Sequence, residues 1–221
     1  VWRYVVATPA VAPVVVADVS GDGDQPFSNA ISVIESGKVP NLFFSGGRDS
    51  RVLLRTAAPR FRMYGYTDET GSTPVGPVTQ LFARDFPATY RGNSAPAAAF
   101  VGGDTDNDPM TPPIYTPVVF FTGLAAASLA GEPCTSSFDS VLFALQGQTG
   151  LAAFDLNSQS NLESDDAFAV IRGQVLQNPH VTSEGTIVID RGLGAQVAPP
   201  PPAAPVTAEL PPQTETTSVV Y

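Results

Sequence analysis

Two stretches of the sequence repeat one pattern, in which a proline leads an apolar run with two phenylalanines and ends in a small hydroxyl residue and glycine. Residues 40–46 read PNLFFSG and residues 117–123 read PVVFFTG, a shift of 77 positions (117 − 40). Downstream, residues 64–66 leading to Gly71 match residues 143–145 leading to Gly150, a shift of 79 positions (150 − 71). Elements that recur in one order indicate a repeated structural unit.

A third match lies upstream, where residues 8–10 (TPA) run into Asp18 and residues 94–97 (SAPA) run into Asp104. Units of several strands joined by variable loops are typical of a β-propeller, whose blades are small antiparallel sheets. A blade usually takes ~40–50 residues. The period of 77 residues therefore predicts either enlarged blades or two blades in each unit.

The composition agrees with strands rather than helices. Gly and Pro together make 41 (19 + 22) of the 221 residues, roughly a fifth, against ~12% in average usage. One helix candidate, residues 164–172, has Asp165 and Asp166 near its start, but the all-β interpretation is favoured. We expect residues 1–195 to form an all-β region, a β-propeller or part of one built from antiparallel blades. Its predicted strands are Val14–Ala17, Asn41–Phe44, Arg51–Arg55, Phe61–Tyr66, Val118–Thr122, Ser140–Leu145, Leu151–Leu156, Val170–Val175 and Thr186–Ile189.

The charge and the reactive residues exclude several classes of function. The formal net charge is −10, with 11 Lys and Arg against 21 Asp and Glu, and nucleic-acid binding needs cations to neutralise phosphates. No apolar run reaches the length of a membrane span. Cys134 is the single cysteine, so it cannot form an internal disulfide. His180 is the single histidine and is interpreted as a surface residue, because no Ser–His–Asp or Cys–His arrangement is recognisable around it. We expect no enzyme activity, and the low cysteine content fits an exported bacterial protein.

The composition changes after residue 195. Four prolines occupy residues 199–202, and Pro205, Pro211 and Pro212 follow. Consecutive prolines lack amide donors and favour extended polyproline II. We expect residues 196–221 to form a Pro/Thr-rich extended or disordered tail that packs on nothing within this chain. The alternative is an arm that docks on another chain through Val219, Val220 and Tyr221.

A short acidic loop is the sharpest local signal. Asp18, Ser20, Asp22 and Asp24 alternate at loop positions 1, 3, 5 and 7, and Gly23 stands at position 6. Calcium takes about six to eight oxygen ligands, and glycine at the sixth position permits the sharp turn. The pattern predicts a Ca²⁺ site, although Asn29 replaces the usual Glu at position 12, so that a last carboxylate would come from elsewhere, such as Glu35. A solvated acidic turn is the alternative.

A second loop carries Asp104, Asp106 and Asp108 at positions 1, 3 and 5 and forms a second candidate Ca²⁺ site. Pro109 takes the place of the glycine, so a metal site and a plain acidic turn stay equally open. A third stretch, residues 155–161, alternates oxygen-bearing side chains, but its amides are neutral and a polar surface loop is favoured.

Two of these motifs resemble known propeller sequences. The acidic loop at residues 18–24 is similar to the calcium-binding loops of integrin-type propellers. Residues 140–150, SVLFALQGQTG, resemble the Leu-Tyr-Ala-Leu-Asp strand and Thr-Gly turn of quinoprotein-type propellers, with Phe143 and Gln146 as departures. Together with Pro133-Cys134, they make residues 1–195 resemble the C-terminal propeller of the PilY family, which comprises adhesins and assembly factors of bacterial type IV pili.

The resemblance implies a calcium-dependent regulator of pilus extension and retraction, exported through the periplasm and exposed at the cell surface. Its implied partners are pilus subunits or a large N-terminal region of the same protein, with a host or surface ligand in addition. Two alternatives stay open at this stage. One is a structural or coat-like extracellular filament component, and the other is a secreted propeller enzyme of unknown substrate.

Overall fold

The structure is a computed structural model that describes a defined part of the chain. The described residues are 1–3, 12, 14–22, 27, 29–47, 60–70, 77–87, 90–103, 114–126, 138–154, 167–172, 174–182, 186–193 and 215–219. The predicted strand Arg51–Arg55 lies outside them.

The described residues form three larger antiparallel sheets and one two-stranded sheet, as expected for an all-β region. Sheet 1 contains β3 (Ser32–Ser36), β4 (Val39–Ser45), β5 (Arg62–Asp68) and β6 (Val78–Asp85) in chain order. Sheet 2 contains β8 (Ala97–Gly103), β9 (Ile114–Ala126), β10 (Phe138–Gln146) and β11 (Phe168–Arg172), and β7 (Arg91–Gly92) also pairs with β9. Sheet 3 contains β12 (Gln174–Val181), β13 (Ile187–Leu193) and β14 (Glu215–Val219).

The remaining elements are short. β1 (Trp2–Arg3) pairs with β2 (Val14–Val15), and Ser20–Asp22 form one 3₁₀ turn, η1. Residues 151–154 hold a single bridge, between Ala152 and Leu145, in place of the predicted strand. The helix candidate is absent from its described part, because Phe168–Arg172 form β11. Among the described residues there is no helix with the length and hydropathy needed to cross a membrane.

The internal repeat is confirmed at the level of strand register. Phe43 pairs with Gly65 across β4 and β5, and Phe120 pairs with Ala144 across β9 and β10. The next pairs also match, Phe44 with Tyr64 and Phe121 with Phe143. Sheets 1 and 2 are therefore two copies of one four-stranded meander.

The upstream part of the proposed repeat is wrong. Ser32 pairs with Phe43 and Ala97 pairs with Phe120, so β3 is the counterpart of β8. The acidic loop that begins at Asp104 connects β8 to β9, and its counterpart is the tight turn at Gly37-Lys38. The Asp18 loop precedes β3 instead. The two acidic loops are therefore not equivalent. The alignment of the two repeat units follows the strand pairing, which matches β3 with β8, and not the short Pro-Ala sequence.

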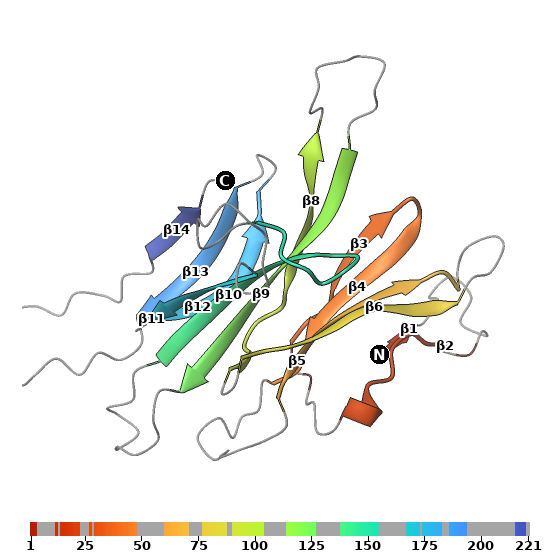
Figure 1. Cartoon of the computed structure of the whole chain (residues 1–221), viewed down its shortest axis with the longest axis horizontal. Helices are drawn as coiled ribbons and strands as arrows, with labels where there is room; N and C mark the ends of the chain where they lie inside the picture. The colour runs from red at the N-terminus through yellow and green to blue at the C-terminus, as the bar shows by residue number, and fades with distance from the viewer. Residues whose placement is uncertain are drawn as a thin grey trace, which may run out of the picture.

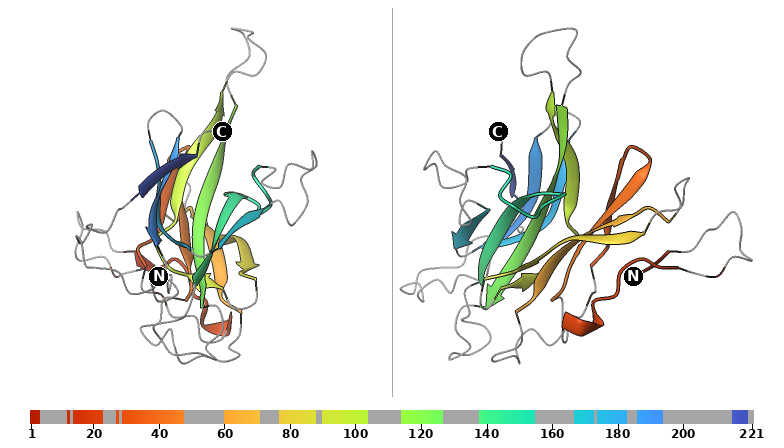
Figure 2. Two further views of the ribbon diagram at one scale, coloured as in Figure 1. Left: turned by 90° about the vertical axis from the view of Figure 1, so that its left-hand side faces the viewer. Right: turned by 45° about the vertical axis from the view of Figure 1, so that its right-hand side comes forward.

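Two apolar cores hold the sheets in a row. The first joins sheet 1 to sheet 2 through residues such as Phe43, Phe82, Phe121 and Phe143, and the second joins sheet 2 to sheet 3 through Phe120 and others. A smaller cluster covers the other face of sheet 1 with residues of the N-terminal segment. Figure 1 shows this row, from the orange strands of sheet 1 through the green strands of sheet 2 to the blue strands of sheet 3. The β8–β9 pair projects beyond its neighbours in all views (Figure 2).

The C-terminal residues correct another expectation. Glu215–Val219 form β14, which pairs antiparallel with β13 from Ile187↔Val219 to Arg191↔Glu215. The prediction that the tail packs on nothing within the chain is wrong for these residues. The physical reason is local composition, because the last proline is Pro212 and the residues after it include β-branched Thr and Val, which favour strands. The expected boundary at residue 195 lies outside the described residues.

Candidate functional site

The first acidic loop packs beside the outer face of sheet 1. Asp18 is exposed, and its Oδ1 accepts a hydrogen bond of 3.0 Å from the backbone N–H of Ser20. This bond lowers the pKa of the Asp18 carboxyl, because it stabilises the charged form. The chain then makes the 3₁₀ turn, closed by a 3.0 Å bond from the Asp22 N–H to the Val19 carbonyl.

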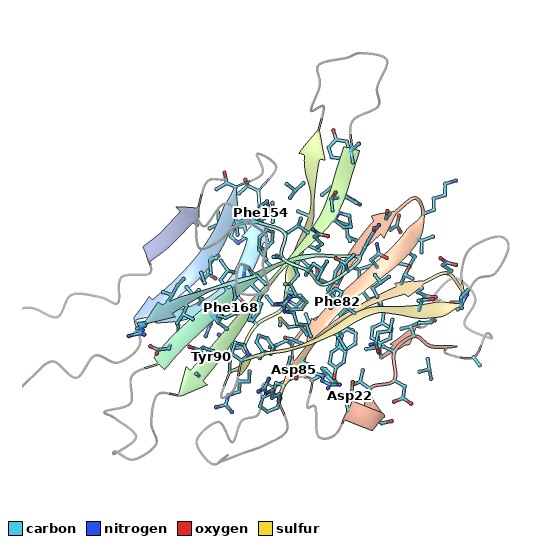
Figure 3. All side chains as sticks on the ribbon, in the orientation of Figure 1. Asp22, Phe82, Asp85, Tyr90, Phe154 and Phe168 are labelled. Carbon is cyan, nitrogen blue, oxygen red and sulfur yellow. The ribbon has the colours of Figure 1, made fainter. Side chains whose placement is uncertain are left out.

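The turn directs Asp22 toward β5. Its Oδ1 accepts from Arg62 Nη1 at 2.7 Å, and its Oδ2 accepts from the Tyr64 hydroxyl at 3.0 Å. Arg62 also donates from Nε to Asp85 Oδ1 at 2.7 Å, so that one guanidinium links two carboxylates at the end of the sheet. Figure 3 labels Asp22 and Asp85 beside each other at this end. We call Asp22, Arg62, Tyr64 and Asp85 the Arg62 cluster.

The cluster shifts the pKa values of its members in the expected directions. The hydrogen bond to Asp85 is the main cause of the raised pKa of Arg62. Burial, followed by the hydrogen bond to Asp22, raises the pKa of Tyr64 well above its ordinary value. Both raised pKa values keep Arg62 and Tyr64 protonated, so that both side chains remain hydrogen-bond donors to the Asp22 carboxylate.

This geometry bears on the predicted calcium ligands Asp18, Ser20, Asp22 and Asp24. Both oxygens of Asp22 accept from the Arg62 cluster, and a guanidinium at 2.7 Å competes with a cation for the same carboxylate. The part of the chain that the structure describes contains no group of three or more His, Cys, Asp or Glu side chains arranged for a metal ion. Asp24 lies outside that part, so the four-residue site stays a prediction.

The two residues considered for the last ligand position lie elsewhere. Glu35 pairs with Pro40 near the β3–β4 turn, at the opposite end of sheet 1 from Arg62. Asn29 lines a pocket between the sheets. Neither is placed beside Asp22 by these contacts. The residues of the second loop, Asp104, Asp106 and Asp108, and those of the third, 155–161, are outside the described residues.

Sequence reasoning missed that pocket. It has a volume of about 360 Å³ and is lined by residues of sheets 2 and 3 and by the segments just before β3 and just after β4. Its walls include Asn29, which precedes β3, and Gly47, which follows β4. Arg91 and Asn93 line it beside β9, and Gln177 lines it from β12. The amides that line it come from segments far apart in the sequence and form no motif.

Glycines allow the strands to approach each other beside the pocket. A Cβ atom on Gly47, which has φ of +123°, would lie 2.5 Å from Arg91 Cβ. A Cβ atom on Gly92 would lie 2.2 Å from Ser45 Oγ. Glycine in a strand often marks such a close approach. Gly47 and Gly92 were therefore the sequence signals that could have pointed to this site.

Comparison with known proteins adds no assignment to this geometry. No protein-family model, no curated protein and no solved structure matches the chain.

Proposed function

We propose that this chain is a run of consecutive β-propeller blades in a calcium-binding, surface-exposed module of a type IV pilus-associated adhesin or assembly factor. The proposal combines the packing of the sheets with the resemblance of residues 18–24 and 140–150 to propeller motifs.

The head-to-tail packing of the sheets carries the proposal. In sheet 1, Phe43 packs in the core shared with sheet 2, and its counterpart Phe120 packs in the core shared with sheet 3. Phe44 and Phe121 occupy the opposite faces, toward the preceding layer. Each copy of the meander therefore uses the same face against its successor. A repeated heterologous contact of this kind generates a ring when the rotation between copies closes.

The arrangement of the first strands supports the same interpretation. β3 contacts β8, and β8 contacts β12, so that the first strands of the three sheets adjoin one another. In a propeller, the first strands of the blades gather around the central axis and the later strands lie outward. The order β3-β4-β5-β6, repeated as β8-β9-β10-β11, agrees with this plan.

A module of this kind would bind partners through its loops. The net charge of −10 disfavours nucleic acid and anionic membranes as partners, because both require cationic surfaces. Pilus subunits and the remainder of a larger surface protein are the proposed partners, and calcium at the Asp18 loop would order the loop for that contact.

Co-sedimentation of the purified chain with purified type IV pili tests this function. We expect the chain to bind pili in the presence of calcium. A chelator should abolish this binding, and Asp18→Asn should weaken it about tenfold. Asp18 is exposed, so the substitution leaves the fold intact. Glu35→Gln removes the same charge at the far end of sheet 1 and serves as the matched control. Absence of binding with and without calcium would refute the pilus assignment.

A further inference from the structure

We propose that the projecting end of the β8–β9 pair binds an extended, basic segment of another protein, which adds as a strand along the outer edge of β8. We call this end the β8–β9 ribbon, and it runs from Phe100↔Pro117 to Gly103↔Ile114. The inference is independent of the pilus assignment, and its test is made without calcium.

The ribbon is an insertion in one copy of the repeat. A two-residue turn at Gly37-Lys38 joins β3 to β4, whereas residues 104–113 lie between β8 and β9. The β8–β9 ladder has seven pairs against five in the β3–β4 ladder, and it projects beyond its neighbours (Figures 1 and 2). Insertions within a repeat often lie on the binding face. The extra length therefore points to a contact that sheet 1 does not make.

Apolar side chains are exposed on both faces of the ribbon. Phe100 and Tyr115 share one face and are 41% and 57% exposed. Val101 and Ile114 share the other face and are 37% and 67% exposed. The register assigns the faces, because directly paired residues share a face and successive residues alternate. Exposed apolar residues that gather in one place mark interaction sites, whereas scattered ones are normal.

The outer edge of β8 can accept a further strand. Among the described residues, β9 is the one strand that pairs with β8, and the unpaired edge of a strand presents backbone N–H and C=O groups. An added strand has side chains on both faces, so it would cover Phe100 on one face and Val101 on the other. A flat partner surface would cover one face only. Strand addition therefore accounts for the exposed residues of both faces.

Two glycines open the second strand of the ribbon to the same edge. Gly102 pairs with Tyr115, and Gly103 pairs with Ile114. Because glycine has no side chain, residues of an added strand can reach across β8 to Tyr115 and Ile114. These two are the most exposed of the four apolar residues of the ribbon. One added strand thus contacts all four.

The charge of this part of the chain selects a basic partner. Residues 97–126, which comprise β8, β9 and the residues between them, include Asp104, Asp106 and Asp108 and no Lys or Arg. Asp104 directly follows Gly103, the last residue of β8. Complementary charge steers partners together and suppresses wrong ones, so Lys or Arg beside the apolar residues of the added segment is favoured.

Two other occupants fit the ribbon less well. A second copy of this chain would bring two sets of these aspartates together, and like charges repel. A bilayer would leave the backbone groups of the β8 edge unpaired, which is strongly unfavourable in hydrocarbon.

Titration of the ¹⁵N-labelled full chain with a synthetic peptide of alternating valine and lysine, followed by NMR in the presence of a chelator, tests the proposal. We expect the backbone amide signals of Phe100, Val101 and Gly102 to shift. A peptide with glutamate in place of lysine reverses the charge, and one with proline at its centre lacks an amide donor there. Each should bind at least about tenfold more weakly.

Variants at exposed positions separate the ribbon from the rest of the surface. Val101→Lys places a cation beside the edge and should weaken binding of the valine–lysine peptide at least about tenfold. Ile114→Ser should weaken it about threefold. Val170→Lys, at a side chain of β11 that is also exposed, adds the same charge elsewhere in sheet 2 and should leave binding unchanged.

Several outcomes would overturn the proposal. These are the absence of shifts in the ribbon, equal binding of the glutamate peptide, and no effect of Val101→Lys. Concentration-dependent self-association that Val101→Lys abolishes would also overturn it, because the occupant would then be a second copy. Binding to phosphatidylcholine vesicles that the same variant abolishes would assign the ribbon to a membrane instead.

Discussion

Phe43 and Phe120 occupy the same register position in two successive sheets, and each packs toward the sheet that follows it. Both side chains are 0% exposed. The position is thus the point at which one copy of the meander joins the next. A chain built in this way depends on each inter-sheet core separately, and the two cores can be probed one at a time.

Replacing either phenylalanine by alanine should destabilise the protein strongly. We expect Phe43→Ala and Phe120→Ala each to lower the free energy of unfolding by about 3–5 kcal/mol, because each leaves a cavity between two sheets. Val33→Ala, at a side chain that is 56% exposed, is the control and should change it by less than about 0.5 kcal/mol. Urea denaturation measures all three. A loss below about 1 kcal/mol at either phenylalanine would show that the core there is loosely packed.

Gly65 should not tolerate a side chain. A Cβ atom there would lie 2.4 Å from Phe82 Cε1, and the Phe82 ring is confined on another side by Gly150. We expect Gly65→Ala to cost about 1–3 kcal/mol through overpacking. Gly21→Ala is the matched control, since no heavy atom lies within 4 Å of its added Cβ. In a double-mutant cycle, the smaller side chain of Phe82→Leu should recover part of the loss, and an additive result would contradict the clash.

Removing the guanidinium of Arg62 should strengthen calcium binding if Asp22 is a ligand. Arg62 Nη1 lies 2.7 Å from Asp22 Oδ1, and its charge opposes a cation at the same carboxylate. We expect Arg62→Gln to tighten binding about threefold to tenfold, or up to about 1.4 kcal/mol, measured by calorimetry. Arg172→Gln removes an equal charge in sheet 2 and should leave affinity unchanged. Weaker binding in Arg62→Gln would show that the cluster holds the loop in its binding conformation.

Stability should fall in alkali because of Tyr64. Its pKa is raised by burial and by the bond to Asp22, whereas an unfolded tyrosine ionises near pH ~10. The unfolded state therefore loses its proton first, so that this contribution to stability is complete below pH ~10 and is lost as the pH rises toward the folded pKa. Melting temperatures followed from pH ~8 to ~12 should fall less steeply in Tyr64→Phe. Tyr115→Phe, at an exposed side chain, should retain the wild-type slope.

The repeat and the strands β4, β5, β9 and β10 were predictable because the local sequence pattern specifies them, whereas β3, β6 and β8 are absent from the predicted strands. Continuous apolar runs between Pro and Gly mark β4 and β9. Successive side chains of a strand point to opposite faces, so Phe43 and Phe120 lie on the face of the following core and Phe44 and Phe121 on the other face. The matching register of β5 and β10 then follows from the downstream Tyr-Gly-Tyr and Phe-Ala-Leu triplets. The upstream match failed because a short Pro-Ala sequence does not specify which strand it pairs with.

Pairings across the fold were decided by tertiary structure alone. In the sequence, Asp22 is one of the four oxygen-bearing residues of the acidic loop. Only the packing of the loop beside β5 brings its carboxylate to Arg62, which lies forty positions away in the chain. The pocket likewise joins Asn29, Asn93 and Gln177, which lie in segments far apart in the sequence. Alternation sets which face of its own sheet a side chain occupies. The partner it meets there depends on how the faces of separate sheets stack, and that is a property of the whole apolar core.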